Sequence, residues 1–540
     1  AKIHLLGSES EALTMIVSIF NDVIGPVMRG PSSSHCAAAL RIGRLARDLM
    51  VGNFNQVLVE FDREGSLPTT HDTQGSDMGL FGGLMGWDAA DPRLPGSPQA
   101  LRDTGVSIAI ETVDAGDPHP NTYRLTLHGA RETHTLNAIS TGGGMMEVIE
   151  IDGFGVSIFG DCFETLLWVR ENAKDVFTAL EAQVGDGEVF LHEAGGRHMV
   201  EVKAPQFLSD EIITSLKGVQ YVKMLAPVLP VLSAKGTRVP FGSCEEMLDY
   251  DAGRGTPLWR LAVQYEMERG GLSEAEVVAK MVAIVHIVRN SIAEGIAGTQ
   301  YDDRVLGHQC GRFDEMMRAG NLLDGGALNR IILYVTSLME VKSSMGVIVA
   351  APTAGACAAL PGAVVAMAES MNLDEEAMAK ALLASGLIGV FIATRWTFAA
   401  EVGGCQAEGG SAASMAGAAL VTLAGGTLEQ SVAAASMAMQ SMIGLICDPI
   451  ANRVEAPCLG KNVMAAANAL SCANMALAGY DPLIPLDEVI DTAKQVAKQM
   501  PREVRCTNLG GLSITPTAIA LEAKLAAQRA ASCGSGCGCG

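Results

Sequence analysis

A change of composition after Thr256 constrains this fold more than any other feature. Ala, Gly, Ser and Met dominate the rest of the chain, β-branched runs shorten, and apolar residues recur at helical spacing. Small side chains let helices approach one another closely. We therefore expect one all-helical domain over residues 258–530.

The first half of the chain has the pattern of strands. β-branched runs predict strands at 57–61, 106–113, 123–127, 135–139 and 146–151, after a helix over 10–25 that ends at Gly25-Pro26. These elements predict an α+β domain over residues 1–153. Residues 154–231 follow with the order strand, helix, strand, strand, helix, strand, which favours a small ferredoxin-like module. A linker over 232–257 and a Cys/Gly tail over 531–540 complete an α+β fold.

Charge and hydropathy exclude several classes of partner. The chain has 38 basic and 60 acidic side chains, a net charge of −22, whereas binding to nucleic acid or an anionic membrane needs clustered Lys and Arg. The longest uncharged run, 345–368, is interrupted by Pro352 and Pro361, so we expect a buried core segment there and not a membrane span. A small-molecule substrate is the expected partner.

The cysteines suggest a reducing compartment. Thirteen cysteines occur at irregular spacing, and no secretory leader is visible at the start of the sequence. Such a pattern in a large chain favours free thiols or metal ligands over a disulfide framework. We expect a cytoplasmic protein.

Two polar segments in the first domain are candidates for function. Gly30-Pro31-Ser32-Ser33-Ser34-His35 precedes a helical pattern over 36–50, which places hydroxyls and free N–H groups at one helix N-terminus. This pattern predicts a carboxylate or phosphate site, although a simple helix cap would need only one serine. The loop 65–77 is too long for a simple turn, and long polar loops are often functional.

Three cysteines in the helical domain each lie where a helix is expected to start or stop. They are Cys405 after Gly403-Gly404, Cys447 before Asp448-Pro449, and Cys458 after Pro457. Gly and Pro release the backbone from helical geometry and allow side chains to point into a shared cavity. Three thiolates would hold a cluster with one iron left open. The spacing alone equally allows three buried, inert cysteines.

Several motifs together resemble the iron–sulfur-dependent L-serine dehydratases (L-serine ammonia-lyases). These motifs are Gly30 to His35, Ala350-Ala351-Pro352-Thr353-Ala354-Gly355, Gly404-Cys405-Gln406-Ala407-Glu408, Cys447-Asp448-Pro449 and Pro457-Cys458 through Asn462. The resemblance covers nearly the whole chain, with the family's β part, an ACT-like module and the catalytic α part fused in one polypeptide. It implies a lyase that dehydrates and deaminates L-serine to pyruvate and ammonium.

The resemblance also implies a cofactor and roles for individual residues. Cys405, Cys447 and Cys458 would ligate a 4Fe-4S cluster, no pyridoxal phosphate would be used, and oxygen would inactivate the enzyme. The open iron would act as a Lewis acid on the β-hydroxyl while a base, which the sequence does not identify, removes the α-proton. Ser33, Ser34, His35 and Thr353 are the implied catalytic residues, and Ser32, Gln74 and Asp77 the implied substrate ligands. A homodimer is implied as well.

The chain departs from the family pattern around the implied site. Gln74 replaces a histidine, Lys342 replaces an asparagine, and Arg395 begins the segment that replaces a second asparagine-containing motif. A buried cation needs a partner. Lys342 and Arg395 would therefore pair with an acidic side chain such as Glu340 or Glu401, bind an extra anionic group of the substrate, or face solvent.

The remaining cysteines divide into two groups. In some family members a cysteine near the carboxyl end is a fourth cluster ligand, and Cys539, Cys537 or Cys533 would serve here, unless the Gly-rich tail is simply disordered. We expect other cysteines, such as Cys162, Cys244, Cys310, Cys472 and Cys506, to be packing residues, whereas the role of Cys36, where the family has a threonine, is left open.

Two further hypotheses follow from these departures. The first keeps the cluster and changes the substrate to another β-hydroxy acid with an extra anionic group, bound by Lys342 and Arg395. The second is a non-catalytic protein that senses an amino acid through the ACT-like module.

Overall fold

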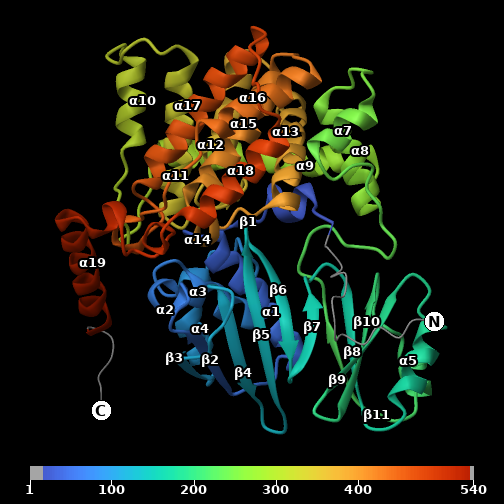
Figure 1. The fold of residues 1–540 in the computed structure, drawn as a ribbon. Coiled ribbons are helices and arrows are strands. Elements are labelled where there is room, and N and C mark those ends of the chain that lie inside the picture. Colours follow the sequence, from blue (N-terminus) through green and yellow to red (C-terminus); the bar gives the residue numbers. More distant parts are fainter. Residues whose placement is uncertain (1–15, 535–540) are drawn as a thin grey trace.

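The computed structural model describes residues 16–534, and side chains as far as residue 528. A layer of helices lies above two β-sheets that stand side by side (Figure 1). The sheets come from the first half of the chain and the helices from the second half. The predicted α+β class is therefore confirmed.

The first sheet has six strands in the order β3-β2-β4-β5-β6-β7. Only β2 and β3 pair in parallel. The strands are β2 (Gln56–Asp62), β3 (Ser107–Val113), β4 (Thr122–His128), β5 (Thr133–Gly142), β6 (Met145–Ile151) and β7 (Phe154–Ile158). The helices that belong to this part are α1 (Ala38–Leu49), α2 (Leu67–Thr70), α3 (Ser76–Leu84) and α4 (Ser97–Asp103). The apolar faces of α1, α3 and the sheet form one continuous core.

Strand β7 was not predicted, and it extends this sheet past the expected limit at residue 153. It forms a hairpin with β6 through Asp152 and Gly153, whose φ angles are 53° and 84°. Two consecutive positive φ angles are the requirement of a type I′ turn, for which Asp-Gly is a preferred sequence. The Asp-Gly dipeptide was the signal for this hairpin.

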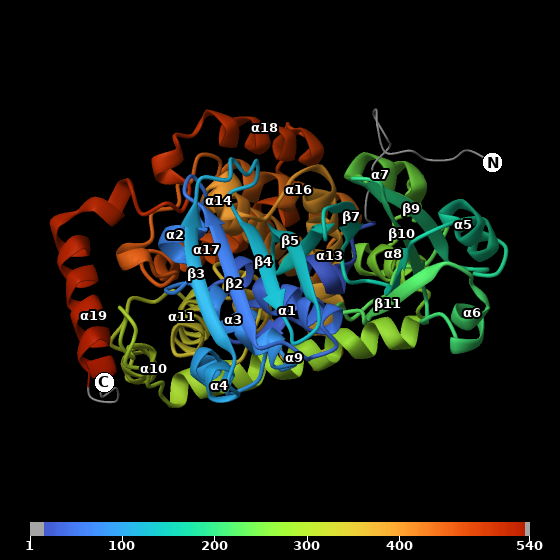
Figure 2. The same ribbon diagram turned by 90° about the horizontal axis from the view of Figure 1, so that it is seen from below.

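The second sheet has the order β11-β8-β10-β9, and all its pairs are antiparallel. Its elements are β8 (Phe163–Val169), α5 (Ala173–Glu181), β9 (Glu188–Ala194), β10 (Arg197–Ala204), α6 (Asp210–Ser215) and β11 (Val219–Leu225). This is the predicted ferredoxin-like βαββαβ arrangement. Seen from below, β7 of the first sheet lies beside β9 of the second (Figure 2).

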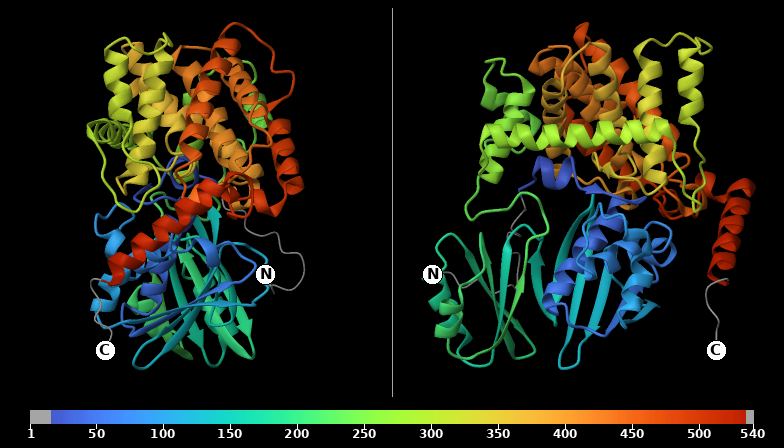
Figure 3. Two further views of the ribbon diagram at one scale, coloured as in Figure 1. Left: turned by 90° about the vertical axis from the view of Figure 1, so that its left-hand side faces the viewer. Right: turned by 180° about the vertical axis from the view of Figure 1, so that it is seen from behind.

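The helical domain is built around α13 (Glu375–Arg395), which packs against α8, α9 and α15. The other helices are α7 (Cys244–Asp251), α8 (Leu258–Gly270), α9 (Glu274–Ala297), α10 (Cys310–Arg318), α11 (Ala327–Ser343), α12 (Ala359–Ser370), α14 (Ala400–Gly403), α15 (Ser411–Leu423), α16 (Leu428–Gln440), α17 (Cys458–Leu477), α18 (Leu486–Gln499) and α19 (Pro516–Gly534). Helix α7 lies in the segment expected to be a linker. The long helix α9 runs along the back of this domain, above the sheets (Figure 3).

The candidate for a membrane span is helix α13. Among residues 16–534 it is the one helix long and apolar enough to cross a bilayer. Most of it is buried against its neighbours, as expected of a core helix in a packed domain.

The N-terminal segment joins the helical layer to the first sheet. Of the helix expected over 10–25, the described part contains one short helical turn, Ile19–Val23, which packs against α13. Strand β1 (Val27–Met28) then pairs with β12 (Ile348–Val349) of the helical domain. This pairing brings the start of the next helix, Ser33–Ala37, to the turn that follows β12, where the Ala354 N–H donates to Ser33 Oγ at 3.2 Å.

Glycines allow α1 and α3 to touch backbone to backbone beneath this start. A Cβ on Gly83 would lie 2.1 Å from the carbonyl oxygen of Leu40, and one on Gly79 would lie 2.0 Å from that of Cys36. Contacts this short cannot be relieved by a side-chain rotation, because both partners are backbone. The close approach fixes the helix start that carries Ser33 to His35.

We predict that Gly83→Ala destabilises the protein by about 1–3 kcal/mol, because α1 and α3 would have to separate. The measurement is the midpoint temperature of thermal unfolding. Gly155→Ala in β7 is the matched control, since its Cβ would meet open space. Equal midpoints for the two variants would contradict the close packing.

Candidate active site

The three cysteines singled out in the sequence meet at the lower edge of the helical domain. Cys405 lies between α14 and α15, Cys447 lies in the loop after α16, and Cys458 begins α17. All three are buried. Cys447 and Cys405 lie in the same buried cluster, and the neighbouring thiol of Cys405 raises the pKa of Cys447. Burial, followed by the negative charge of Cys405, raises the pKa of Cys458.

A fourth cysteine, Cys506, lies beside this group. Its side chain is buried in the same small cluster as Cys405 and Cys447. Its burial agrees with the packing role expected from the sequence, although the sequence did not predict that it would lie next to Cys447. The available signal was its setting, a non-periodic stretch ending in Gly510-Gly511, which resembles the loops of the other three.

Hydrogen bonds join the loops that carry Cys405 and Cys447. Gln406 N–H donates to the carbonyl of Leu445 at 2.9 Å, and Gln406 Oε1 accepts from Gly444 N–H at 2.9 Å. Gly404 has a φ of 70°, and a Cβ there would lie 3.0 Å from Leu445 O. The turn before Cys405 therefore needs glycine for both its backbone angle and its close packing.

Lys461 provides a positive charge beside the thiols. It lies one helical turn after Cys458 on α17, and its Nζ is 3.7 Å from Cys405 Sγ. The same ammonium donates to Asp448 Oδ1 at 2.6 Å and to the carbonyl of Ile446 at 2.7 Å. Burial works to lower the pKa of Lys461, but the charges of Cys405 and Asp448 outweigh it and raise the pKa. The ammonium is suited to balance thiolates.

A hollow opens next to Cys405 and Cys458. The residues that line it are Gly355, Ala356, Cys405, Glu408, Gly409, Cys458, Lys461 and Asn462. Thr353 lies at its edge and donates to Glu408 Oε1 at 2.7 Å. Asn462 holds the turn after Thr353 in place, because its Nδ2 donates to the Gly355 carbonyl at 2.8 Å and its Oδ1 accepts from Ala359 N–H at 3.1 Å.

His35 is buried between two hydroxyl groups. Its Nε2 is 2.8 Å from Thr70 Oγ1, and its Nδ1 is 2.9 Å from Ser32 Oγ. Because the Thr70 hydroxyl donates its proton to the Ser66 carbonyl at 2.7 Å, it must accept from His35 Nε2–H. Nδ1 is then the acceptor for the Ser32 hydroxyl. Burial lowers the pKa of His35 to about 3, so the ring is neutral at neutral pH.

Glu401 connects His35 with the thiols. Its Oε1 lies 3.6 Å from His35 Nδ1, and its side chain is 5% exposed. Its Oε2 has no hydrogen-bond partner among the described residues. Burial, reinforced by the charge of Glu408, raises the pKa of Glu401 to about 7. Burial also raises the pKa of Glu408. Two carboxyl groups with raised pKa values therefore lie between the first domain and the cysteines.

The other predicted site residues of the first domain lie around this network. Ser33 and Ser34 are buried at the helix start. Gln74 reaches across to the helical domain, where its Nε2 donates to Asn452 Oδ1 at 3.2 Å, and its Oε1 is left unpaired within residues 16–534. Asp77 is engaged by His71 at 2.8 Å.

The two predicted cations have different surroundings. Arg395 ends α13 with a side chain that is 30% exposed and pairs with Asp487 and Asp491 of α18, so the structure does not bring it into the site. Lys342, near the end of α11, is 0% exposed, and its Nζ has no hydrogen-bond acceptor in the described part of the chain. Its charge acts to lower the pKa values of Cys458 and Glu408 against the larger effect of burial.

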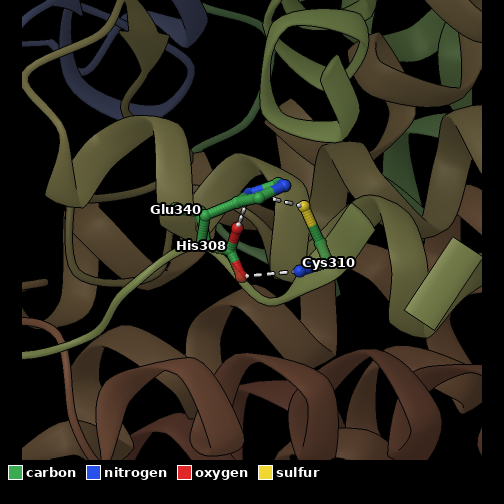
Figure 4. Close-up of side chains that lie close together, drawn as sticks. All are labelled: His308, Cys310 and Glu340. Atoms are coloured by element: carbon green, nitrogen blue, oxygen red, sulfur yellow. Dashed lines mark hydrogen bonds and ion pairs between the residues drawn. The ribbon is translucent and has the colours of Figure 1, made fainter. Parts of the chain in front are cut away.

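Neither acidic residue suggested as a partner reaches these cations. Glu340 instead holds the start of α10, as Figure 4 shows. Its Oε2 lies 2.9 Å from His308 Nδ1, and its Oε1 accepts the N–H groups of Gln309 and Cys310, both at 2.9 Å. The ligand atoms of His308, Cys310 and Glu340 lie within 4.8 Å of one another, as a metal site would require. Because internal hydrogen bonds already satisfy Glu340, the arrangement is explained as a helix cap.

Comparison with known proteins identifies the family of this chain. Residues 253–513 match the family model described as serine dehydratase alpha chain. L-serine dehydratase 1 of Escherichia coli is 31% identical over 500 residues, which cover 90% of this chain and 96% of the relative. In Bacillus subtilis, a probable L-serine dehydratase alpha chain is 34% identical and aligns with 53% of this chain and 95% of the relative. The corresponding beta chain is also 34% identical and aligns with 37% of this chain and 92% of the relative.

This chain belongs to the L-serine dehydratase family. The expected resemblance is thereby confirmed, including the fusion of the β and α parts, and the protein is an enzyme of the lyase class. In this serine dehydratase the β part supplies His35 and its hydroxyl partners, and the α part supplies the thiols, Lys342 and Glu401.

We predict that Lys342→Met raises the midpoint temperature of the metal-free serine dehydratase, corresponding to about 1–3 kcal/mol. The reason is that a buried ammonium without a hydrogen-bond acceptor costs free energy that an apolar side chain of similar length does not. Lys223→Met is the control, because that buried ammonium is paired with Glu132 at 2.8 Å and its loss should lower the midpoint. A lower midpoint for both variants would contradict the unpaired state of Lys342.

Proposed function

We propose that this serine dehydratase holds a 4Fe-4S cluster and converts L-serine to pyruvate and ammonium. The observation that carries the proposal is the meeting of Cys405, Cys447 and Cys458 from three separate helix ends beside Lys461. Thiolates are the preferred ligands of such clusters, and a nearby cation offsets their charge. The donor set therefore fits the group.

The chain's own residues suggest how substrate would be held. When bound, a cluster with one iron not held by the three cysteines supplies a Lewis acid for the β-hydroxyl of serine. The hollow beside Cys405 and Cys458 is the place for that hydroxyl. The helix start at Ser33 to His35 offers N–H groups and hydroxyls to the α-carboxylate, because the first turn of a helix has free donors and a positive dipole end.

Proton transfer is assigned to Glu401, with His35 as the positioning residue. A general base works best when its pKa lies near the working pH, and burial raises the pKa of Glu401 to about 7. Neutral His35 presents Nδ1 to Ser32 and lies 3.6 Å from Glu401. Glu408, joined to Thr353 at the edge of the hollow, is placed to hydrogen-bond the leaving hydroxyl.

A second substrate class is favoured by one observation, the unpaired ammonium of Lys342. A second carboxylate or a phosphate on a β-hydroxy acid would give this buried cation the partner it lacks. Arg395 contributes nothing to this alternative, because it pairs with α18. Anoxic assays with serine, threonine and hydroxylated dicarboxylates separate the two classes, and a dicarboxylate converted faster than serine would favour the second.

We also propose a cytoplasmic location. All ten cysteines whose side chains the structure describes are free thiols, including the neighbours Cys447 and Cys506. Adjacent thiols stay reduced in a compartment kept reducing by glutathione and thioredoxin.

Removal of one cluster ligand should abolish both cofactor and activity. We predict that anoxically purified Cys458→Ser contains far less iron and sulfide than the unchanged protein and forms no pyruvate from L-serine. Cys472→Ser, on the same helix but next to Asn468, is the matched control and should keep both. A full cluster in Cys458→Ser, or no iron in the unchanged protein, would contradict the proposed function.

The role of Glu401 predicts a specific pH dependence. Because the carboxylate is the active form, kcat/KM for serine should rise as pH increases through about 7 and level off above about 8. Glu401→Gln should lose at least ~100-fold in kcat/KM together with this rise. A Glu401→Gln enzyme with the same pH profile as the unchanged enzyme would exclude Glu401 as the base.

A further inference from the structure

We propose that Lys342 is a buried counter-charge of the cluster and makes the cluster harder to oxidise. This inference rests on the proposed function, because it assigns a role to a side chain beside the thiols that would hold the cluster. Lys342 replaces a neutral asparagine of the family pattern, so the charge is a feature of this chain. The ammonium would act on the cofactor whether or not substrate is present, which separates this role from substrate binding.

The first support is the enclosure of the ammonium group. Lys342 is the penultimate residue of α11, a helix that packs against α12 and against α17, the helix of Cys458. Its side chain is 0% exposed, and its Nζ has no hydrogen-bond acceptor in the described part of the chain. Burial of an ammonium costs free energy that only nearby negative charge offsets. The position therefore calls for an anionic neighbour.

The second support is the set of groups on which this charge acts. Lys342 acts to lower the pKa values of Cys458 and Glu408, and also those of Cys357 and Glu455. Cys458 and Glu408 line the hollow of the candidate site, whereas Lys342 does not. The ammonium therefore lies behind side chains that line the hollow, next to a proposed cluster ligand.

The carboxyl groups near Lys342 are engaged by other donors. Glu408 Oε1 accepts the Thr353 hydroxyl at 2.7 Å. Glu455 Oε2 accepts the N–H groups of residues 305–306 at 2.8 and 2.9 Å, in the loop before α10. Burial raises the pKa values of both carboxyl groups, which favours their neutral forms. Charge from these two groups thus offsets the buried ammonium only in part.

A second ammonium in the same region provides a comparison. Lys461 Nζ donates to Asp448 Oδ1 at 2.6 Å and lies 3.7 Å from Cys405 Sγ, so a carboxylate already balances it. Cys539, expected as a further cluster ligand, lies outside the described residues, which leaves three thiolates to count. A 4Fe-4S cluster held by three thiolates carries net negative charge. Lys342 supplies positive charge that no hydrogen-bonded carboxylate balances.

The consequence concerns the electrons of the cluster. A buried positive charge favours the form of the cluster that holds more electrons, so Lys342 raises the reduction potential. A 4Fe-4S core that passes one electron to dioxygen yields superoxide, and release of Fe²⁺ from the oxidised core then leaves a 3Fe-4S core. By making the first step less favourable, Lys342 protects the iron that the cysteines do not hold.

The test is a redox titration of the anoxically purified full-length protein, followed by electron paramagnetic resonance. We expect Lys342→Met to shift the midpoint potential of the cluster to a more negative value and to lose one iron several-fold faster after addition of ferricyanide, a one-electron oxidant. Lys342→Asn, a neutral side chain of different size, should behave in the same way. Lys223→Met is the matched control, because it removes a buried ammonium of β11 that pairs with Glu132, and it should change neither quantity.

The outcomes separate this inference from the proposed function. Thermal unfolding of the metal-free variants shows that they are folded. If Lys342→Met keeps the potential and the rate of iron loss of the unchanged protein, Lys342 is not a counter-charge. An unchanged potential together with an altered preference between serine and hydroxylated dicarboxylates would assign Lys342 to the substrate and also overturn the inference. In both cases the cluster on Cys405, Cys447 and Cys458 stands, whereas absence of iron from the unchanged protein would remove the proposed function itself.

Discussion

Several ionisable groups are buried together at the boundary between the helical domain and the first sheet, and the rest of the structure serves to keep them there. Thiols, two carboxyl groups and the ammonium groups of Lys342 and Lys461 share this region. Charge in a low-dielectric interior is costly unless it is balanced. Lys342 Nζ has no hydrogen-bond acceptor among the described residues, although its charge acts on the carboxyl groups of Glu408 and Glu455, and a thiolate-held cluster would add further negative charge to this region.

The connectivity of the chain explains how such a region can form. Each cysteine comes from a helix end or a loop, so that bringing the loops together also fixes the packing of α15, α16 and α17. The β1–β12 pairing adds the helix start with Ser33 to His35, and the glycine contact of α1 with α3 prevents that start from moving. The candidate site is therefore built from both halves of the chain, whereas in Bacillus subtilis the related alpha and beta chains are separate proteins.

The sequence predicted those features that depend on local pattern. The ferredoxin-like module follows from alternating strands and helices, and the grouping of Cys405 with Cys447 and Cys458 from helix breaks together with family motifs. The features that depend on long-range packing were missed or misplaced. Cys506 comes next to Cys447 only because the two loops pair with each other, and Arg395 pairs with Asp487 and Asp491 on a helix about a hundred residues later. The local sequence does not distinguish Arg395, which pairs with acidic side chains near the surface, from Lys342, which is fully buried.

The most direct test of the account is an anoxic crystal structure of the serine dehydratase with anomalous diffraction data collected at the iron edge. The account predicts iron centred among Cys405, Cys447 and Cys458, with Lys461 beside it. Iron at His308, Cys310 and Glu340, or no iron near these three cysteines, would contradict it.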